Sequence, residues 1–202
     1  SSSSEEERFR NEPLRDFSLA EARLAMRDAI DQVQHQIGQQ WPSAAGGLTL
    51  TGPVMKSRNP SRPDEVVGVV QGASQVDVEQ AVGRAAEAWK AWRETPSERR
   101  VQMIRAAAAL MRSRRETLAA WEVLECGKPW READADIAEA IDFLEFYALE
   151  WLRLAPAKRL GHQPGELNHR LFTPRGVTAV IAPWNFPLAI PMLAGPGASS
   201  TV

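Results

Sequence analysis

The feature that most constrains the fold of this sequence is an apolar run that ends in a short loop of proline and aromatic residues. Val177 to Ala182 carries apolar side chains on both faces of an extended chain, which is typical of a parallel strand covered by helices on either side. The run leads directly into Pro183-Trp184-Asn185-Phe186-Pro187. Because α/β sheets bind ligands at the carboxyl ends of their strands, we expect a ligand site at this loop.

Asn185 is the residue of this loop that can do polar chemistry. Pro183 and Pro187 restrict the backbone on either side, so the asparagine amide can be held in one direction. A donor with a fixed direction is what stabilisation of a developing oxyanion requires. The residues alone fit a purely structural turn equally well, and both interpretations stay open at this stage.

The sequence predicts several helices in the part of the chain before this loop. Apolar residues recur at helical spacing from Ser18 to Ile37, and Ser18 with Glu21 has the spacing of a capping box. Ser74 with Asp77 has the same spacing at the start of a second helix. Further helices are expected around residues 97–111, from 116 to a stop at Gly127, and at 130–154. The fold class is therefore α/β, with a helix-rich N-terminal half.

Short strands are expected between and after these helices. Leu48 to Thr51, Val54 to Ser57 and Glu65 to Val70 are separated by turn residues, which predicts a small antiparallel sheet. Leu167 to Phe172 predicts another strand. We divide the chain into a disordered or extended tail at 1–17, with a Ser/Glu tract at Ser1 to Glu7, a main unit at 18–192 and a divergent tail at 193–202.

Composition excludes several classes of protein. The 202 residues carry 24 basic and 26 acidic side chains, so the charge balance does not favour a nucleic acid or an anionic membrane as partner. The one cysteine, Cys126, cannot form an internal disulfide, and we expect a cytoplasmic protein without a membrane span. The three histidines lack ligand spacing, so no metal site is expected.

Several motifs, taken in order along the chain, carry a resemblance to a known family. The loop Pro183 to Pro187 resembles the Pro-Trp-Asn-Phe-Pro loop of the aldehyde dehydrogenase superfamily. Glu125-Cys126-Gly127-Lys128-Pro129 resembles the Glu-x-Gly-Lys-Pro turn of that family, and Asn59-Pro60 resembles its Asn-Pro turn. The stretches Phe9 to Leu14 and Ala138 to Phe143 are similar to the Δ1-pyrroline-5-carboxylate (L-glutamate γ-semialdehyde) dehydrogenases of proline catabolism. The resemblance thus implies the helix-rich N-terminal part of such an enzyme, with an incomplete Rossmann-like cofactor domain.

The resemblance also implies roles for individual residues. Asn185 would donate a hydrogen bond to the substrate oxygen as it becomes an oxyanion, and Phe186 would pack against the aldehyde chain. Glu139 would lie near the ammonium group of the substrate, although an exposed helical glutamate without a role is an equally good interpretation. The remaining implied residues line the nicotinamide side of a site for NAD or NADP, and they are Ile181, Ala182, Pro183 and Trp184.

The covalent chemistry of the family has no counterpart in these residues. The resemblance places the nucleophilic cysteine in a Gly-Gln-x-Cys segment that this sequence lacks. Cys126 occupies the variable position of its turn, at a helix C-terminus where the macrodipole disfavours a thiolate, so we expect a structural role for it. Two glycines and a proline after Met192 should break a helix, and a premature stop or frameshift would produce such an ending.

Three functions follow from these expectations. The first is the N-terminal part of an NAD(P)-dependent aldehyde dehydrogenase, inactive alone, whose intact form would act on a small aldehyde and could form a homo-oligomer. Alternatively, it is a non-catalytic oligomerisation or interaction module with Leu167 to Phe172 as an open strand edge. Cofactor binding without catalysis is a third option, which a single strand and loop support poorly.

Overall fold

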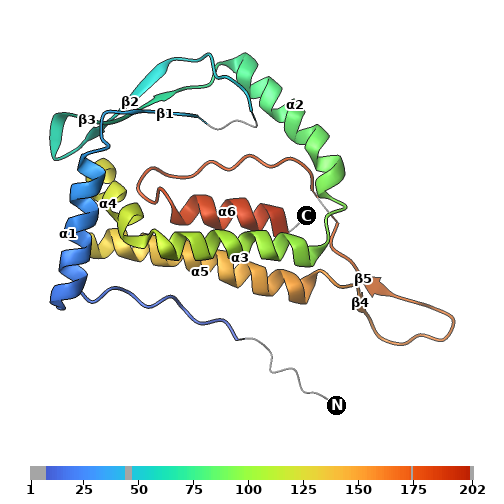
Figure 1. Ribbon diagram of the computed structural model, residues 1–202. Helices are drawn as coiled ribbons and strands as arrows, with labels where there is room; N and C mark the ends of the chain where they lie inside the picture. Colours follow the sequence, from blue (N-terminus) through green and yellow to red (C-terminus); the bar gives the residue numbers. More distant parts are fainter. Residues whose placement is uncertain (1–7, 44–46, 174, 201–202) are drawn as a thin grey trace.

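The computed structural model describes residues 8–43, 47–173 and 175–200, and it shows helices beside a small sheet (Figure 1). The predicted disordered tract at Ser1 to Glu7 lies outside the described residues. Five helices lie close to one another: α1 (Ala20–Gln34), α3 (Ser97–Ser113), α4 (Arg115–Cys126), α5 (Trp130–Leu154) and α6 (Ala189–Ser200). The sixth helix, α2 (Gln75–Trp92), runs from the sheet to the start of α3 (Figure 1).

The hydrophobic core lies among the five neighbouring helices, and α5 contributes most to it. α5 packs against α3, α4 and α6, and α1 packs against α4. Ile137, Ile141 and Leu144 lie on the inner face of α5 and are almost completely inaccessible to water. Met26 and Val33 of α1 complete the same cluster. The predicted apolar faces of these helices are therefore confirmed as packing faces.

The small sheet differs from the predicted antiparallel one. It has the order β1-β3-β2, where β1 is Gln40–Trp41, β2 is Val54–Asn59 and β3 is Arg62–Gln71. β2 pairs antiparallel with β3 as predicted, but the third strand is β1, which pairs parallel with β3. The prediction of a strand at Leu48 to Thr51 is wrong.

The residues around Thr51 instead complete the start of α2. The Thr51 N–H donates to Asp77 Oδ2 at 2.7 Å, so it is engaged with the start of a helix and not with a neighbouring strand. The Ser74 N–H donates to the same carboxylate oxygen at 2.8 Å, and the Ser74 hydroxyl accepts the Asp77 N–H at 3.2 Å. These N–H groups, that of Ser74 first and that of Thr51 second, lower the pKa of Asp77 to about 2. The predicted capping box at Ser74 is confirmed.

The equivalent prediction at Ser18 is wrong. α1 begins at Ala20, and its N-cap residue, Leu19, makes no side-chain capping bond. The Ser18 N–H donates instead to Asp16 Oδ1 at 2.9 Å. The Asp16 side chain thus accepts a backbone hydrogen bond in a local turn, at the position where the capping box was expected.

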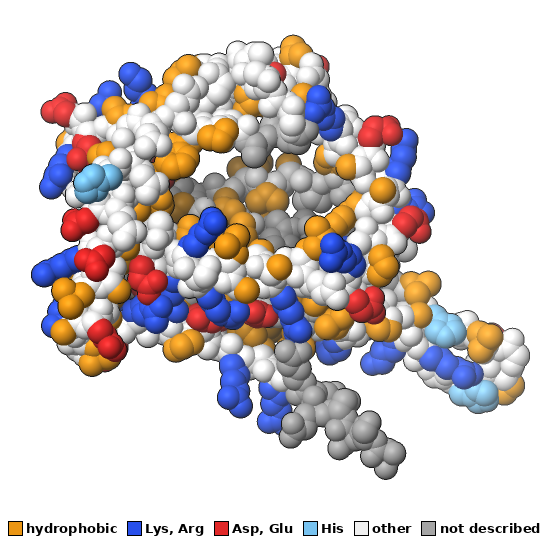
Figure 2. All heavy atoms as spheres, viewed as in Figure 1, with side chains coloured by type: hydrophobic (Ala, Val, Ile, Leu, Met, Phe, Trp, Pro, Cys, Tyr) orange, Lys and Arg blue, Asp and Glu red, His pale blue; other side chains and the backbone are white. Residues whose placement is uncertain are grey.

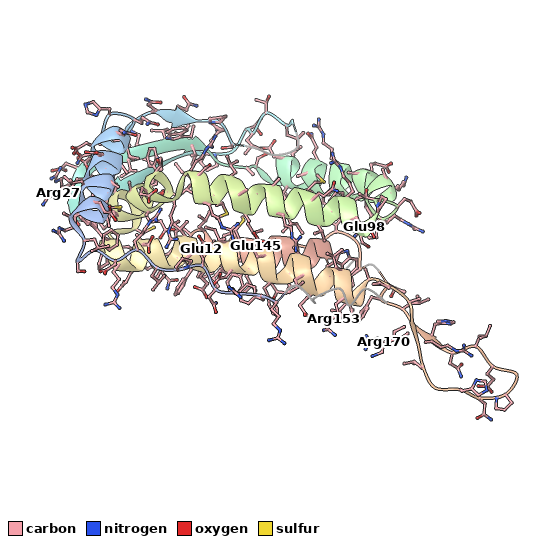
Figure 3. All side chains as sticks on the ribbon, turned by 60° about the horizontal axis from the view of Figure 1, so that its bottom comes forward. Glu12, Arg27, Glu98, Glu145, Arg153 and Arg170 are labelled. Atoms are coloured by element: carbon pink, nitrogen blue, oxygen red, sulfur yellow. The ribbon has the colours of Figure 1, made fainter. Side chains whose placement is uncertain are left out.

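Ahead of α1, residues 8–17 form an extended arm that runs along α5. The Asn11 side-chain amide and the Glu12 N–H both donate to Asp142, each at 2.7 Å. Arg112 Nε donates to Glu12 Oε2 at 2.8 Å, and Arg112 Nη1 donates to Glu145 Oε1 at 2.7 Å, on the face that Figure 3 shows. Polar contacts therefore hold this arm on the helices.

The C-terminal third contains two departures from the predicted strands. Leu167 to Phe172 was expected to form a strand, but only β5 (His169–Arg170) pairs, antiparallel with β4 (Lys158–Arg159). These strands form a hairpin that projects from the body of the molecule (Figure 1). Val177 to Ala182 forms no strand at all. A strand needs a neighbour for its backbone hydrogen bonds, and no described strand lies next to it.

The predicted helix break in the tail is also wrong, because α6 runs from Ala189 to Ser200. Pro196, the proline on which that prediction rested, lies within α6 and does not end the helix. Ala189 is fully buried against the core, and α6 packs along α5. Tertiary packing thus overrides the low helix propensity of this glycine-containing segment. Thr201 and Val202 lie outside the described residues.

Candidate active site

The predicted loop lies over a cavity of about 420 Å³. Three segments line this cavity: the turn after α4 at residues 126–129, one face of α5 between Glu132 and Glu139, and the loop residues Trp184 to Phe186. The first and last of these segments correspond to two of the motifs that the sequence singled out. The fold therefore brings the two motifs to the walls of a single cavity.

The turn after α4 is shaped by Gly127 and by the β2–β3 hairpin. Gly127 ends α4 in the left-handed conformation with φ 68°, which favours glycine. A Cβ atom at this position would lie 2.8 Å from Pro60 Cγ, so the hairpin packs directly on the turn. The Ser57 hydroxyl donates to Glu125 Oε1 at 2.6 Å and ties the same two segments together. The Asn-Pro hairpin and the Gly-Lys-Pro turn thus form one structural unit.

Helix α5 presents a row of carboxylates to the cavity. Glu132, Asp136 and Glu139 are spaced four and three residues apart, which places them on one face of the helix. Asp136 is buried with an exposed fraction of 2%, whereas Glu132 and Glu139 are exposed. The buried Asp136 carboxylate is positioned to bind other parts of the protein, whereas the exposed Glu132 and Glu139 carboxylates are accessible to a ligand.

Asp136 anchors the end of the loop. Its Oδ2 atom accepts the N–H groups of Leu188 and Ala189, each at 3.3 Å. These are the backbone donors at the start of α6, so the carboxylate acts as a helix cap supplied by another helix. The orientation of the chain leaving the loop is therefore set by a side chain about fifty positions earlier in the sequence.

Lys128 connects the turn, the helix and the loop. Its Nζ atom lies 3.3 Å from Asp136 Oδ1 and 3.2 Å from Glu122 Oε2. The same ammonium group lies 5.0 Å from the centroid of the Phe186 ring, within the range of a cation–π interaction. The Lys128 side chain has an exposed fraction of only 12%. One buried cation thus contacts two buried carboxylates and an aromatic residue of the loop.

Glu122 has an unusual protonation equilibrium in this cluster. Its pKa is raised to about 8, by burial first and by the neighbouring Asp136 carboxylate second, while Lys128 opposes the shift. Near neutral pH the Glu122 carboxyl group is therefore largely protonated. This arrangement avoids two negative charges beside a single buried lysine.

Four of the predicted site residues meet at the cavity, and three do not. Trp184, Asn185, Phe186 and Glu139 all contribute to its lining. The other three, Ile181, Ala182 and Pro183, precede the cavity, and Ile181 has an exposed fraction of 93%. The cofactor role assigned to Ile181 through Trp184 stays a prediction.

Two residues of the site, Lys128 and Asp136, were missed as functional candidates. Lys128 was noted only as part of a turn motif, and Asp136 was not singled out. The spacing of the carboxylates along α5 was a usable signal, because it places Asp136 on the same face as Glu139. No local pattern, however, indicates that Lys128 lies beside them, because that contact depends on the angle between the turn and α5.

Cys126 borders the cavity but is poorly suited to nucleophilic chemistry. Its thiol is half-buried and lies 3.8 Å from the Trp184 carbonyl oxygen, which accepts its weak hydrogen bond. Burial first, and then the charge of Glu125, raises the thiol pKa to about 11. The reactive thiolate form is therefore scarce near neutral pH, and Cys126 serves as a packing and tethering residue.

Two further kinds of site receive no support from the described residues. No group of histidine, cysteine, aspartate and glutamate side chains in the described ranges could hold a metal ion. No helix in the same part of the chain is long and apolar enough to cross a membrane. For a nicotinamide cofactor, Ile181 and Trp184 offer an exposed apolar wall, which fits packing against a ring but includes no phosphate-binding turn.

With this geometry established, comparison with known proteins identifies the family. The profile of the aldehyde dehydrogenase family matches residues 50–198. The 1-pyrroline-5-carboxylate dehydrogenase of Bacillus pumilus is 46% identical over 183 residues, and 1-pyrroline-5-carboxylate dehydrogenase 1 of Halalkalibacterium halodurans is 43% identical over 183 residues. Each alignment covers 90% of this chain and 36% of the relative.

Solved structures agree with these relatives. The 1-pyrroline-5-carboxylate dehydrogenase from Thermus with bound NAD superimposes with a TM-score of 0.90 and 44% identity, over 96% of this chain and 38% of that one. Proline utilization A from Bdellovibrio bacteriovorus gives a TM-score of 0.92 with 40% identity, over 96% of this chain and 20% of that one. The α/β chain described above belongs to the aldehyde dehydrogenase family, and it spans little more than a third of the curated relatives' length.

Proposed function

We propose that this chain forms the N-terminal part of an enzyme that oxidises L-glutamate γ-semialdehyde to a carboxylate in proline catabolism, with NAD or NADP as the hydride acceptor. The observation that supports this proposal is the convergence of Asn185, Phe186 and Glu139 on one cavity. The family membership and the names of the relatives above support the substrate class.

Each of the three residues has a distinct part in the proposed chemistry. The Asn185 amide donates a hydrogen bond to the aldehyde oxygen, which gains negative charge when a nucleophile adds to the carbonyl carbon. Phe186 packs against the carbon chain of the substrate, on the ring that Lys128 also contacts. Glu139, exposed at the cavity, pairs with the ammonium group at the far end of the substrate.

The proposal includes that residues 1–202 do not turn over aldehyde by themselves. Covalent aldehyde oxidation needs a thiolate that attacks the carbonyl carbon. Cys126 is the only cysteine of the chain, and burial holds its thiol protonated near neutral pH. The nucleophile must therefore come from elsewhere in a complete enzyme.

A complementation assay tests the proposed function. The purified chain is mixed with the substrate and NAD, and NADH absorbance is followed; we expect no aldehyde-dependent signal. The chain is then co-expressed with the remaining C-terminal part of the Bacillus pumilus relative, and turnover is expected to appear. Asn185→Ala in this assembly should lower kcat about 10²- to 10³-fold, because one oxyanion donor is lost.

The matched control for that variant is Gln32→Ala, which removes an exposed amide from α1, away from the cavity. Turnover by the chain alone would contradict the proposed need for an external nucleophile. Turnover of the assembly that is unaffected by Asn185→Ala would contradict the oxyanion role.

The projecting β4–β5 hairpin favours a second function, that of an assembly module. Its region exposes large apolar side chains, with exposed fractions of 75% for Leu167 and 65% for Leu171. Exposed apolar residues beside a short strand pair favour pairing with another chain. Size-exclusion chromatography tests this: Leu167→Ser with Leu171→Ser should shift an oligomer to monomer, whereas a wild-type chain that is already monomeric would contradict it.

A further inference from the structure

We propose that Lys128 and Asp136 act together as positioning residues that hold the Trp184-Asn185-Phe186 loop in one orientation over the cavity. The catalytic meaning of this inference rests on the proposed function of Asn185, but the physical claim concerns only the order of the loop. It can therefore be tested in this chain without any substrate.

The first step of the argument is that the loop cannot fix itself by packing. Trp184 has an exposed fraction of 79%, Phe186 one of 39%, and Asn185 is exposed as well. Side chains this exposed bury too little apolar surface to order a loop. The order of the loop must therefore come from contacts made by its backbone or by its neighbours.

The second step is that Asp136 supplies such contacts at the C-terminal end of the loop. Its Oδ2 atom accepts the N–H groups of Leu188 and Ala189, which otherwise have no acceptor within α6. Ala189 is fully buried, so without Asp136 its N–H would have no water molecule as a hydrogen-bond acceptor. The Asp136 carboxylate thereby fixes where the loop ends and α6 begins.

The third step is that Lys128 compensates the burial of the Asp136 carboxylate. The Asp136 side chain has an exposed fraction of 1%, and a buried carboxylate without a counter-charge is strongly unfavourable. Lys128 Nζ lies 3.3 Å from the Oδ1 atom, the oxygen that the α6 N–H groups do not use. Oδ2 thus accepts the hydrogen bonds at the end of the loop, and Oδ1 lies beside the Lys128 ammonium group.

The fourth step is that Lys128 also contacts the loop directly. Its ammonium group lies 5.0 Å from the centroid of the Phe186 ring, next to Asn185 in sequence. The Cys126 thiol, two residues earlier, donates to the Trp184 carbonyl oxygen. The loop is therefore held from both sides of Asn185: Trp184 by the turn, Phe186 by Lys128, and the exit of the loop by Asp136.

Hydrogen exchange and side-chain NMR of the isotope-labelled chain test this arrangement. The variant is Lys128→Met, which keeps most of the length of the unbranched side chain and removes its charge. We expect amide exchange at Leu188 and Ala189 to accelerate about tenfold or more, because charge-assisted hydrogen bonds of this kind are weakened. The side-chain amide resonances of Asn185 should shift at the same time, while exchange at Ile141 in the core stays unchanged.

Two further variants separate positioning from general stability. Lys128→Arg should restore slow exchange at Leu188 and Ala189, because it keeps the positive charge. Lys56→Met is the matched control, since it removes an exposed lysine from β2, and it should leave Asn185 unaffected. Unchanged exchange and unchanged Asn185 resonances in Lys128→Met would overturn the proposal, as would an equal acceleration at Ile141.

If Lys128→Met does not fold, Asp136→Asn decides the question, because it preserves the shape of the side chain. Faster exchange at Leu188 and Ala189 with a protected core supports the proposal, and unchanged exchange overturns it. None of these readouts involves aldehyde or cofactor. A failure of the complementation assay would therefore count against the proposed function only. The amide exchange and the Asn185 resonances decide this inference independently.

Discussion

The helices packed around α5 and the segment that runs from the β4–β5 hairpin to Pro187 contrast sharply, although both are rich in apolar residues. Ile141 on α5 has an exposed fraction of 0%, whereas Ile181 has one of 93%. The two side chains are chemically identical and differ only in whether other elements cover them. Apolar patterning therefore shows which residues can form a core, and the presence of neighbouring elements decides which of them do.

α2 resembles the segment from the β4–β5 hairpin to Pro187, because its apolar face is also left partly uncovered. Val78 and Val82 lie on its apolar face, and about half of each side chain remains exposed. Figure 2 shows the molecule hollowed between α2 and the helices below it, with hydrophobic side chains around the hollow. The first turn of α2 is tied through the capping contacts of Asp77, and Trp92 at its last residue lies 5.7 Å from the Arg100 guanidinium of α3. The five-helix core and this open region should thus respond very differently to mutation.

The largest difference is expected at the buried ion pair of Arg115 and Asp134. Arg115 Nε and Nη2 donate to the two Asp134 oxygens at 2.6 and 2.8 Å, and both side chains are buried. Asp134→Ala should lower the free energy of unfolding by about 3–5 kcal/mol, because it leaves a buried guanidinium without its main partner. Urea denaturation measures the change. The exposed Asp28→Ala on α1 serves as control and should stay within about 0.5 kcal/mol.

Replacing the two isoleucines tests the comparison directly. Ile141→Ala should lower the free energy of unfolding by about 2–5 kcal/mol, because it removes buried methyl groups and leaves a cavity. Ile181→Ala should change it by less than about 0.5 kcal/mol, because that side chain is already in water. Similar losses in the two variants, measured by the same denaturation experiment, would show that Ile181 is covered in solution.

A smaller effect is expected from the pH dependence of Glu122. Its pKa in the folded chain is about 8, compared with 4.5 as the ordinary value, so the folded state binds more protons between these two pH values. The contribution to stability is complete below about pH 4.5 and is lost as pH rises through about 8. We expect a loss on the order of 1–2 kcal/mol, less than the full shift corresponds to, since relaxation and water penetration reduce the cost of a buried charge.

Glu122→Gln should abolish that part of the pH dependence, and urea denaturation across a pH series measures it. Glu79→Gln, an exposed change on α2, should leave the wild-type pH dependence in place. A wild-type chain whose stability rises between these pH values, and a Glu122→Gln variant that removes the rise, would reverse the assigned direction.

The smallest effect on stability is expected on the uncovered face of α2. Val82→Lys should change the free energy of unfolding by no more than about 0.5 kcal/mol, because Val82 packs against little. The added charge should instead reduce concentration-dependent association, since it interrupts an exposed apolar surface. Light scattering over a concentration series measures this effect. A large loss of stability would mean that the α2 face is covered in solution.

The predictions made from sequence succeeded where local chemistry was sufficient. The capping box of Ser74 and Asp77 formed, and Gly127 ended α4, because each depends on a few adjacent residues. The capping box of Ser18 and Glu21 did not form, because Asp16 offered a competing local bond. The strand expected at Val177 to Ala182 is absent, because a strand depends on a neighbour that no local pattern supplies.

The sequence by itself determined the helices before the loop, the turn motifs and the family, because periodicity, caps and short motifs are properties of neighbouring residues. Only the tertiary structure decided how the site is assembled. It brings the backbone of Leu188 to Lys128 and Asp136, although Leu188 lies 52 positions after Asp136 in the chain. The physical reason is that their contact follows from how α5, α6 and the turn after α4 pack around the core, and burial then converts a lysine and an aspartate into an anchor for the Asn185 loop.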